Sequence, residues 1–218
     1  MNDKTALIIG ASGATGKPLL EQLLNDDHFS QVIVFVRKNL PIQHAKLTQH
    51  IIDFDNVASW QDLVQGDVLF SCLGTTLKDA GSKDAQRKVD YDYQYNFARI
   101  AKQNAVASYV LVSAMMADPQ SPFFYSRIKG ELEQSVQALN FERCIILRPS
   151  MLSRPDTNRL GEQVAEKALS VLGRFKMLKK HRPLPTQDLA QAMRIAEQRL
   201  QQGNHILDIT AIQNLLSH

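Results

Sequence analysis

The stretch that decides the fold is Thr5-Ala6-Leu7-Ile8-Ile9 followed by Gly10-Ala11-Ser12-Gly13-Ala14-Thr15-Gly16. The apolar run predicts a buried strand, and the glycine-rich loop predicts a turn into a helix. In this spacing Gly10 allows a tight turn, Gly13 lets backbone N–H groups approach a pyrophosphate, and Gly16 lets helix and strand pack closely. A helix N-terminus also offers unpaired N–H groups and a positive dipole end, so the unit predicts a dinucleotide site. The alternative is a plain strand-to-helix turn.

The same strand–helix alternation continues through the first two thirds of the chain. Apolar runs at 32–36, 68–72, 109–112 and 144–147 predict further strands, and another short strand is expected near 49–52. Runs that are apolar on both faces are typical of a parallel sheet covered by helices. The sequence therefore predicts an α/β fold, namely a Rossmann-like doubly wound parallel sheet with helices on both faces.

Helical patterns occupy the stretches between these strands and much of the remaining chain. Two are expected at about 15–25 and 83–104, and a third is expected to begin with Ser121 as N-cap and Pro122 as its first residue. Further on we expect an amphipathic helix at 160–172, a long last helix capped by Thr186 and ended by Gly203, and a final strand at 205–209. We expect a single domain, 1–218, with a dinucleotide-binding core (1–149) and a small C-terminal substrate lobe that includes the last strand (150–218).

Composition excludes several classes of protein. The 218 residues are 44% hydrophobic and 22% charged, as in ordinary globular chains, and a net charge of +3 does not indicate a nucleic-acid partner. No apolar run reaches the roughly 18 residues of a membrane span. The two cysteines lie in apolar runs and the six histidines show no ligand spacing, which predicts no disulfide scaffold and no metal. A cytoplasmic location is expected.

The end of the second strand indicates which dinucleotide binds. An NAD site usually places Asp or Glu here, whereas an arginine suits a 2′-phosphate. Arg37 and Lys38 therefore favour NADP(H) over NAD(H), with a solvated basic pair as the alternative. Asp53 and Phe54 follow the next strand and could border the adenine, and a turn role for Asp53 is the competing interpretation.

A candidate catalytic group lies further along the chain. Tyr125 and Lys129 are four residues apart, which places a phenol and an ammonium on one face of a helix. A nearby cation stabilises a phenolate, so Tyr125 could deliver a proton to a carbonyl oxygen that receives a hydride. Ser113, at the end of the preceding strand, could hydrogen-bond the same oxygen. The alternative is an exposed helical Tyr–Lys pair.

Several stretches together resemble one family over nearly the whole chain. They are 10–16, 72–76, 89–93, 125–131 and 148–150, and they resemble the atypical short-chain dehydrogenases/reductases, most of all the Tat-interactive-protein-like oxidoreductases. The resemblance implies Ser113, Tyr125 and Lys129 as the catalytic set, with Lys129 also holding ribose hydroxyls. It implies cofactor contacts from Leu73, Gly74 and Thr75 on the nicotinamide-side ribose, and from Pro149, Ser150 and Met151 around the nicotinamide.

The chain also departs from the wider superfamily at two positions. Asp90 stands where that superfamily often has a fourth catalytic residue, asparagine, which puts a proton relay through this position in doubt. Ser113 is followed by Ala114 where paired serines are frequent, so Ser113 is the only local candidate.

These features predict an NADPH-dependent reductase of a small apolar carbonyl, such as an aldehyde, ketone or quinone. The short C-terminal part argues against a nucleotide-sugar substrate. The substrate pocket is expected to be lined by apolar residues: Met115, Met116, Phe123, Phe124, Met151 and Leu152. For each of them, ordinary core packing is the alternative. Two other functions stay open, an NADPH-binding regulator with little turnover and an epimerase or dehydratase that returns its cofactor unchanged. Homo-oligomer formation is left open. Trp60 is interpreted as packing, and the basic cluster as a solvated face: Lys176, Lys179, Lys180, His181 and Arg182.

Overall fold

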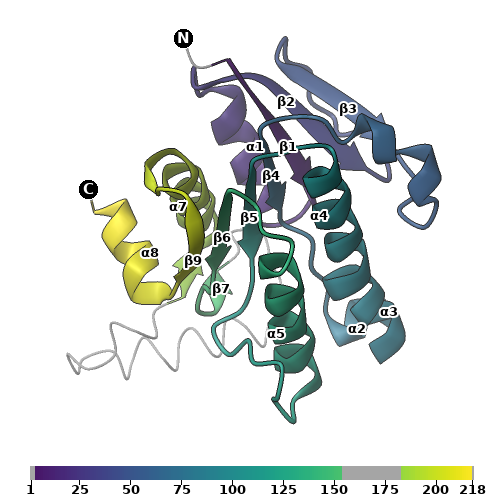
Figure 1. The fold of residues 1–218 in the computed structure, drawn as a ribbon, viewed down its shortest axis with the longest axis vertical. Helices are drawn as coiled ribbons and strands as arrows, with labels where there is room; N and C mark the ends of the chain where they lie inside the picture. The colour runs from purple at the N-terminus through teal and green to yellow at the C-terminus, as the bar shows by residue number, and fades with distance from the viewer. Residues whose placement is uncertain (1–2, 154–182, 218) are drawn as a thin grey trace.

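A computed structural model describes residues 3–153 and 183–217 and shows a seven-stranded sheet in the order β3-β2-β1-β4-β5-β6-β9 (Figure 1). Every pairing in this sheet is parallel. The order reverses between β1 and β4, which is where open α/β sheets bind ligands. The predicted doubly wound sheet is confirmed, with strands β1 (Lys4–Ile9), β2 (Phe29–Val36), β3 (Leu47–Ile51), β4 (Val68–Ser71), β5 (Ser108–Val112), β6 (Arg143–Leu147) and β9 (Gly203–Leu207).

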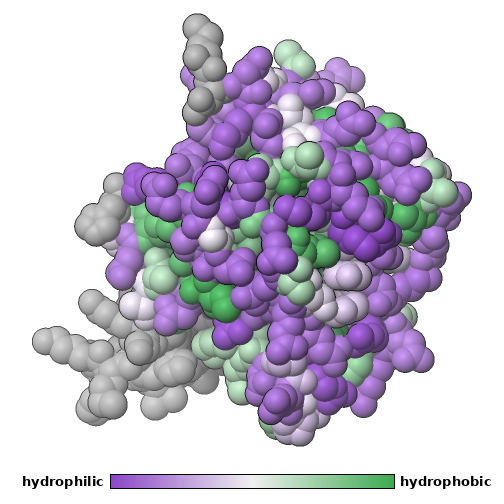
Figure 2. All heavy atoms as spheres, in the orientation of Figure 1, coloured by the Kyte–Doolittle hydropathy of each residue, from purple (hydrophilic) through white to green (hydrophobic). Residues whose placement is uncertain are grey.

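Helices cover both faces of the sheet. Side chains of β1 alternate between two hydrophobic clusters, with Ala6 and Ile8 in one and Leu7 and Ile9 in the other. The first cluster is completed by α1 (Gly16–Leu24), α7 (Thr186–Arg199) and α8 (Ile209–Leu216), and the second by α4 (Tyr93–Gln103) and α5 (Phe124–Gln137). The molecular face in Figure 2 is mostly hydrophilic, because these helices enclose the strands' apolar side chains.

Trp60 belongs to the second cluster, as predicted. It lies between two short 3-10 turns, η1 (Val57–Ser59) and η2 (Gln61–Leu63), and its ring stacks on Phe97 at 4.0 Å between centroids. Its indole N–H donates to the carbonyl oxygen of Asp53 at 3.0 Å. Trp60 is therefore a core residue with its polar atom satisfied.

The helix expected at 83–104 is interrupted by a π-turn. The chain after β4 forms α2 (Leu77–Ala80) and α3 (Lys83–Arg87), then the π-turn η3 (Lys88–Asp92), and then α4. A π-turn adds a residue to the helical cycle and is frequent at functional sites. Asp90 lies in this turn and is fully buried.

Two predicted helix caps are wrong. Helix α5 begins at Phe124 rather than Pro122, because the Ser121 hydroxyl accepts from the Phe123 amide two residues ahead at 3.2 Å and closes a turn before the helix. Helix α7 begins at Thr186 itself with Pro185 as N-cap. In both places a hydroxyl near the helix start is present, but it does not cap the helix.

The C-terminal part also differs from expectation. Helix α7 ends at Arg199, and Gly203, with φ +114°, begins β9 rather than ending the helix. Strand β9 stops at Leu207, and the Asp208 carboxylate accepts from the Ala211 amide and caps a further helix, α8. A second sheet pairs β7 (Leu152–Ser153) with β8 (Leu184–Pro185). The helix expected at 160–172 and the basic cluster lie outside the described residues.

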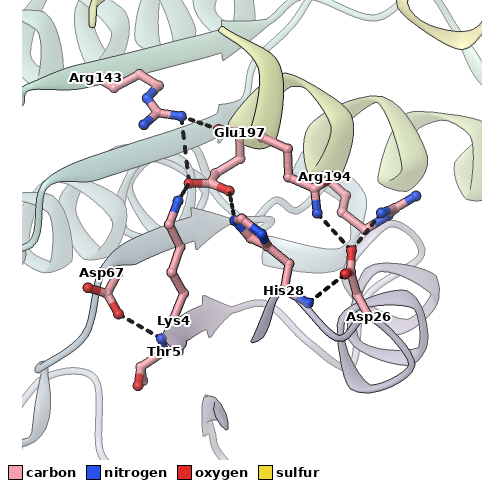
Figure 3. Close-up of polar contacts among 9 residues, drawn as sticks. Lys4, Thr5, Asp26, His28, Asp67, Arg143, Arg194 and Glu197 are labelled. Atoms are coloured by element: carbon pink, nitrogen blue, oxygen red, sulfur yellow. Dashed lines mark hydrogen bonds and ion pairs between the residues drawn. The ribbon is translucent and has the colours of Figure 1, made fainter. Parts of the chain in front are cut away.

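A buried ion cluster joins α7 to the amino ends of the strands (Figure 3). Glu197 on α7 is almost fully buried. Its Oε1 atom lies 2.8 Å from Lys4 Nζ and 3.7 Å from Arg143 Nη1, and its Oε2 atom lies 4.0 Å from His28 Nε2. Asp26 accepts from Arg194 at 2.6 Å and from Gln198 at 2.8 Å. The two carboxylates therefore attach α7 to the end of the sheet opposite the glycine loop.

Candidate functional site

The loop after β1 has the geometry that a bound pyrophosphate needs. Gly10 adopts φ +83°, and a Cβ there would lie 2.6 Å from the carbonyl carbon of Cys72. The Gly13 amide donates to the Gly10 carbonyl at 2.9 Å, and α1 begins at Gly16. The first turn of α1 contains no acidic residue, so its positive end is not neutralised from within the helix. The loop therefore fits an anionic dinucleotide.

A cavity of about 680 Å³ opens at the carboxyl ends of β1, β4 and β5. This volume is in the range of small-molecule and cofactor sites. It runs from the glycine loop to the candidate catalytic residues, and it includes the following predicted site residues: Gly13, Ala14, Thr15, Leu73, Gly74, Thr75, Ser113, Tyr125 and Lys129. Tertiary folding thus brings together residues from four separate stretches of the chain.

The other predicted cofactor residues do not line this cavity. Arg37 and Lys38 are exposed just beyond the end of β2. The Asp53 carboxylate accepts from the Asp55 amide at 3.0 Å, which is the turn role considered above, and the Phe54 ring packs against Tyr93. The remaining predicted residues outside the cavity lining are Gly10, Ala11, Ser12, Gly16, Pro149, Ser150 and Met151.

The apolar residues expected around the substrate divide into two groups. Phe124 and Leu152 line the cavity. Met115, Met116, Phe123 and Met151 are exposed and lie outside its lining.

Burial raises the pKa of the Cys72 thiol, another lining residue, to about 12, so this group is a neutral thiol and a poor nucleophile.

Lys129 and Asp90 form a buried pair beside the cavity. Lys129 Nζ lies 3.8 Å from Asp90 Oδ1, and the Asp90 Oδ2 atom accepts from the Thr75 amide at 3.2 Å. Burial lowers the pKa of the Lys129 ammonium, and the Asp90 and Glu133 carboxylates oppose that shift. Burial likewise raises the pKa of Asp90, against the pull of Lys129.

The two candidate catalytic hydroxyls have different surroundings. Tyr125 is 43% exposed in the first turn of α5 and borders the cavity. Ser113 follows β5, and its hydroxyl donates to the buried carboxylate of Glu133. Glu133 in turn accepts from Arg148, whose Nε lies 3.0 Å from Oε1 and 3.2 Å from Oε2.

Sequence reasoning missed Glu133 and the part that Arg148 plays. Glu133 continues the four-residue spacing of Tyr125 and Lys129 along α5, which was the available signal. Gly130, which lies in the 125–131 stretch, has a steric role. A Cβ at this position would overlap the backbone of Asp118 and Pro119, so Gly130 is what allows α5 to approach the loop that follows Ser113.

No group of three or more His, Cys, Asp or Glu in 3–153 and 183–217 is arranged to hold a metal ion. Within the same ranges, no helix is long and apolar enough to cross a bilayer.

The fold and the loop geometry define the class: an NAD(P)-binding protein of Rossmann type. A family model described as NAD(P)H-binding matches residues 10–193, and the chain belongs to this family. Protein HTATIP2 of Rattus norvegicus is 37% identical over 172 residues, covering 77% of this chain and 71% of that protein. Protein FMP52, mitochondrial, of Saccharomyces cerevisiae is 37% identical over 156 residues, covering 70% and 67%.

Solved structures show the same fold at low sequence identity. MoeE5 in complex with UDP-glucuronic acid and NAD has a TM-score of 0.71 at 16% identity, covering 94% of this chain and 76% of that one. The UDP-glucose 4-epimerase of Thermotoga maritima with UDP-glucose has a TM-score of 0.71 at 11% identity, covering 98% and 80%.

The match to HTATIP2 and the NAD(P)H-binding family model confirm the resemblance to a Tat-interactive-protein-like, NAD(P)-binding oxidoreductase family.

Proposed function

We propose that this protein is an NADPH-dependent reductase of a small apolar carbonyl, an aldehyde, ketone or quinone. One observation carries the proposal: a single cavity joins the glycine loop to Ser113, Tyr125 and Lys129. A dinucleotide held at the loop would therefore lie in the same space as a phenol and an ammonium suited to proton transfer.

The residues of the chain have distinct roles in this proposal. The loop 10–16 and the first turn of α1 bind the pyrophosphate, and the Gly74–Thr75 backbone borders the nicotinamide-side ribose. The cofactor, when bound, supplies the hydride. Tyr125 donates its phenolic proton to the carbonyl oxygen, and the Lys129 ammonium stabilises the phenolate that remains. Phe124 and Leu152 contribute apolar contacts for the substrate.

The preference for NADPH over NADH rests on Arg37. This residue is exposed beyond the end of β2, where a guanidinium can form a bidentate contact with the phosphate on the adenosine ribose. No carboxylate immediately follows β2 to accept from a free ribose 2′-hydroxyl, since the chain continues as Arg37-Lys38-Asn39.

The test is turnover of a carbonyl panel by the purified protein. Aromatic aldehydes, aliphatic ketones and phenanthrenequinone are each mixed with NADPH, and both NADPH loss and alcohol or hydroquinone formation are measured. We expect stoichiometric conversion of at least one carbonyl class. Tyr125→Phe should lower kcat by about a hundredfold or more while NADPH still binds, because general acid catalysis contributes on that scale. Tyr95→Phe, a tyrosine on α4 outside the cavity, is the matched control.

Two alternative functions correspond to other outcomes of the same assay. Product formation without net NADPH consumption would support a dehydratase or an epimerase, and epimerase is the activity named for the Thermotoga neighbour. Tight NADPH binding without turnover of any carbonyl would support a cofactor-binding regulator. Full activity of Tyr125→Phe on a reduced substrate would refute the proposed proton donor.

A further inference from the structure

An ammonium group in the cavity lining, that of Lys83, has no part in the proposed mechanism. Lys83 is an exposed residue at the start of α3. Its Nζ atom lies 5.6 Å from the centre of the Phe124 ring, which lines the same cavity. Phe124 immediately precedes Tyr125, so this cation lies beside an apolar contact expected for the substrate and near the proposed proton donor.

The packing of α3 against α5 gives Lys83 this position. The two helices lie side by side (Figure 1), and Arg87, one turn after Lys83, pairs with Glu131 on α5 at 2.6 Å. This ion pair attaches the end of α3 to the middle of α5. The start of α3 therefore lies against the first turn of α5, where Phe124 is found.

Lys83 has no carboxylate at ion-pair distance in the part of the chain that the structure describes. The next two cations along the chain do have such partners: Arg87 pairs with Glu131, and Lys88 lies 2.7 Å from Asp55. Helix stability does not account for Lys83 either, because a cation is disfavoured at the N-terminal end of a helix.

The other charges of the lining differ from Lys83 in their surroundings. Lys129 faces the buried carboxylate of Asp90 at 3.8 Å. Asp79 on α2 is the acidic residue among the described lining residues, and its carboxylate accepts from the Thr76 hydroxyl at 2.8 Å. Of the two lining lysines in 3–153 and 183–217, Lys83 is therefore the one without an opposite charge at ion-pair distance.

We propose that Lys83 is a specificity-determining residue that binds an anionic group, a carboxylate or a sulfonate, on the carbonyl substrate. The inference rests on the proposed reductase function and narrows its substrate class to an apolar carbonyl compound with one acidic substituent. The apolar body of such a compound contacts Phe124, and its anionic group meets the ammonium that lies over the same ring.

The anionic group takes no part in the bond changes. The carbonyl carbon gains a hydride from NADPH, which is oxidised to NADP⁺, and the carbonyl oxygen gains the Tyr125 proton. The phenolate regains its proton from water. The ion pair with Lys83 is present in the bound substrate and in the transition state alike, so it should lower KM and leave kcat nearly unchanged.

Two other interpretations of Lys83 are possible to test in parallel. If Lys83 contacts the phosphates of the cofactor, its removal should weaken NADPH binding. If it is only a solvated cation that covers Phe124, its removal should affect charged and neutral substrates alike.

The probes are 3-carboxybenzaldehyde and 4-carboxybenzaldehyde, each compared with its neutral methyl ester. We measure kcat and KM at saturating NADPH for wild type, Lys83→Gln and Lys83→Glu. The matched control is Lys78→Gln, because Lys78 is an exposed lysine on the neighbouring α2 and lies outside the cavity lining. The acid-to-ester ratio of kcat/KM is compared across variants, which cancels the difference in intrinsic reactivity between acid and ester.

For at least one of the two acids, Lys83→Gln should lower this ratio about fivefold, the upper end of what an exposed ion pair contributes. The change should come from a higher KM for the acid. Lys83→Glu should lower the ratio further, because it replaces attraction with repulsion, and Lys78→Gln should keep the wild-type ratio. Calorimetric titration should give the same NADPH affinity for wild type and Lys83→Gln.

Two results would overturn the inference alone. One is an acid-to-ester ratio that is the same in Lys83→Gln and Lys78→Gln for both acids, whether or not NADPH binding weakens. The other is wild-type protein that reduces neutral carbonyls but neither acid. Wild-type protein that reduces no carbonyl at all would refute the proposed function, and the assignment of Lys83 with it.

Discussion

Lys129 Nζ lies 3.8 Å from Oδ1 of Asp90, and both side chains are almost completely buried beside the cavity. Asp90 reaches this position because it lies in the π-turn η3. Its carboxylate opposes the effect of burial, which lowers the pKa of the Lys129 ammonium. The Asp90 carboxylate therefore helps to keep Lys129 charged.

Asp90→Asn should move the alkaline limb of the kcat–pH profile to lower pH. The substitution removes a charge that raises the pKa of Lys129, so the ammonium is lost at a lower pH and phenolate stabilisation is lost with it. The measurement is phenanthrenequinone reduction across the pH range, with Asp92→Asn, two residues along in the same turn, as control. An unmoved limb, or one displaced to higher pH, would contradict this electrostatic role.

Arg37→Ser should reduce the preference for NADPH. We expect NADPH binding to weaken about tenfold, or about 1.4 kcal/mol, with NADH binding unchanged, because only NADPH carries the phosphate that Arg37 would contact. Calorimetric titration with each nucleotide checks this expectation. Arg99→Ser removes a guanidinium from α4, where it contacts Gln103, and serves as the control. If Arg37→Ser weakened the binding of NADPH and of NADH equally, Arg37 would not discriminate between the two nucleotides.

Glu197→Gln should destabilise the protein by about 3 kcal/mol, the lower end of the range for breaking a buried ion pair, because Lys4 and Arg143 keep partial access to water. The free energy of unfolding from urea titration is the measurement. Glu142→Gln, an exposed glutamate beside β6, should change it by less than about 0.5 kcal/mol. Similar values for the two variants would mean that the cluster in Figure 3 does not hold α7 in place.

Asp26→Asn should lower stability at neutral pH by about 1–2 kcal/mol, since Asp26 is a charged acceptor for Arg194 and Gln198. Partial burial works against ionisation of this carboxyl. Hydrogen bonds from the His28 amide and from the Arg194 and Gln198 side chains outweigh it and hold the pKa below its usual value.

The sign of the pH dependence follows from that lowered pKa. The unfolded chain binds the proton more tightly than the folded chain, so the contribution of Asp26 is present above the ordinary aspartate pKa and is lost as pH falls through the folded-state value. The difference between wild type and Asp26→Asn should therefore shrink in acid. The adjacent Asp27→Asn removes a fully exposed carboxylate and should have little effect at any pH. A difference that grows on acidification would reverse the argument.

Helix starts were harder to predict than strands. Buried strands such as β1 and β6 are marked by continuous apolar runs that few other structures accommodate. A serine or threonine near a helix start can instead bond another nearby backbone group or lie inside the first turn, as Ser121 and Thr186 do. Local sequence does not distinguish these outcomes, because each satisfies a similar number of backbone groups.

The sequence by itself determined the sheet, the glycine loop and the Tyr125–Lys129 spacing. Each of these depends on residues that are close in the chain, where strand and helix geometry sets the distances. Only the tertiary structure decided the surroundings of those groups: Asp90 against Lys129, and Ser113 and Arg148 against Glu133. These partners are 39, 20 and 15 residues apart in the chain. They meet because neighbouring parallel strands end at the same edge of the sheet and α5 passes along that edge. Burial at that edge makes these pairings necessary, because a charged group removed from water needs a partner.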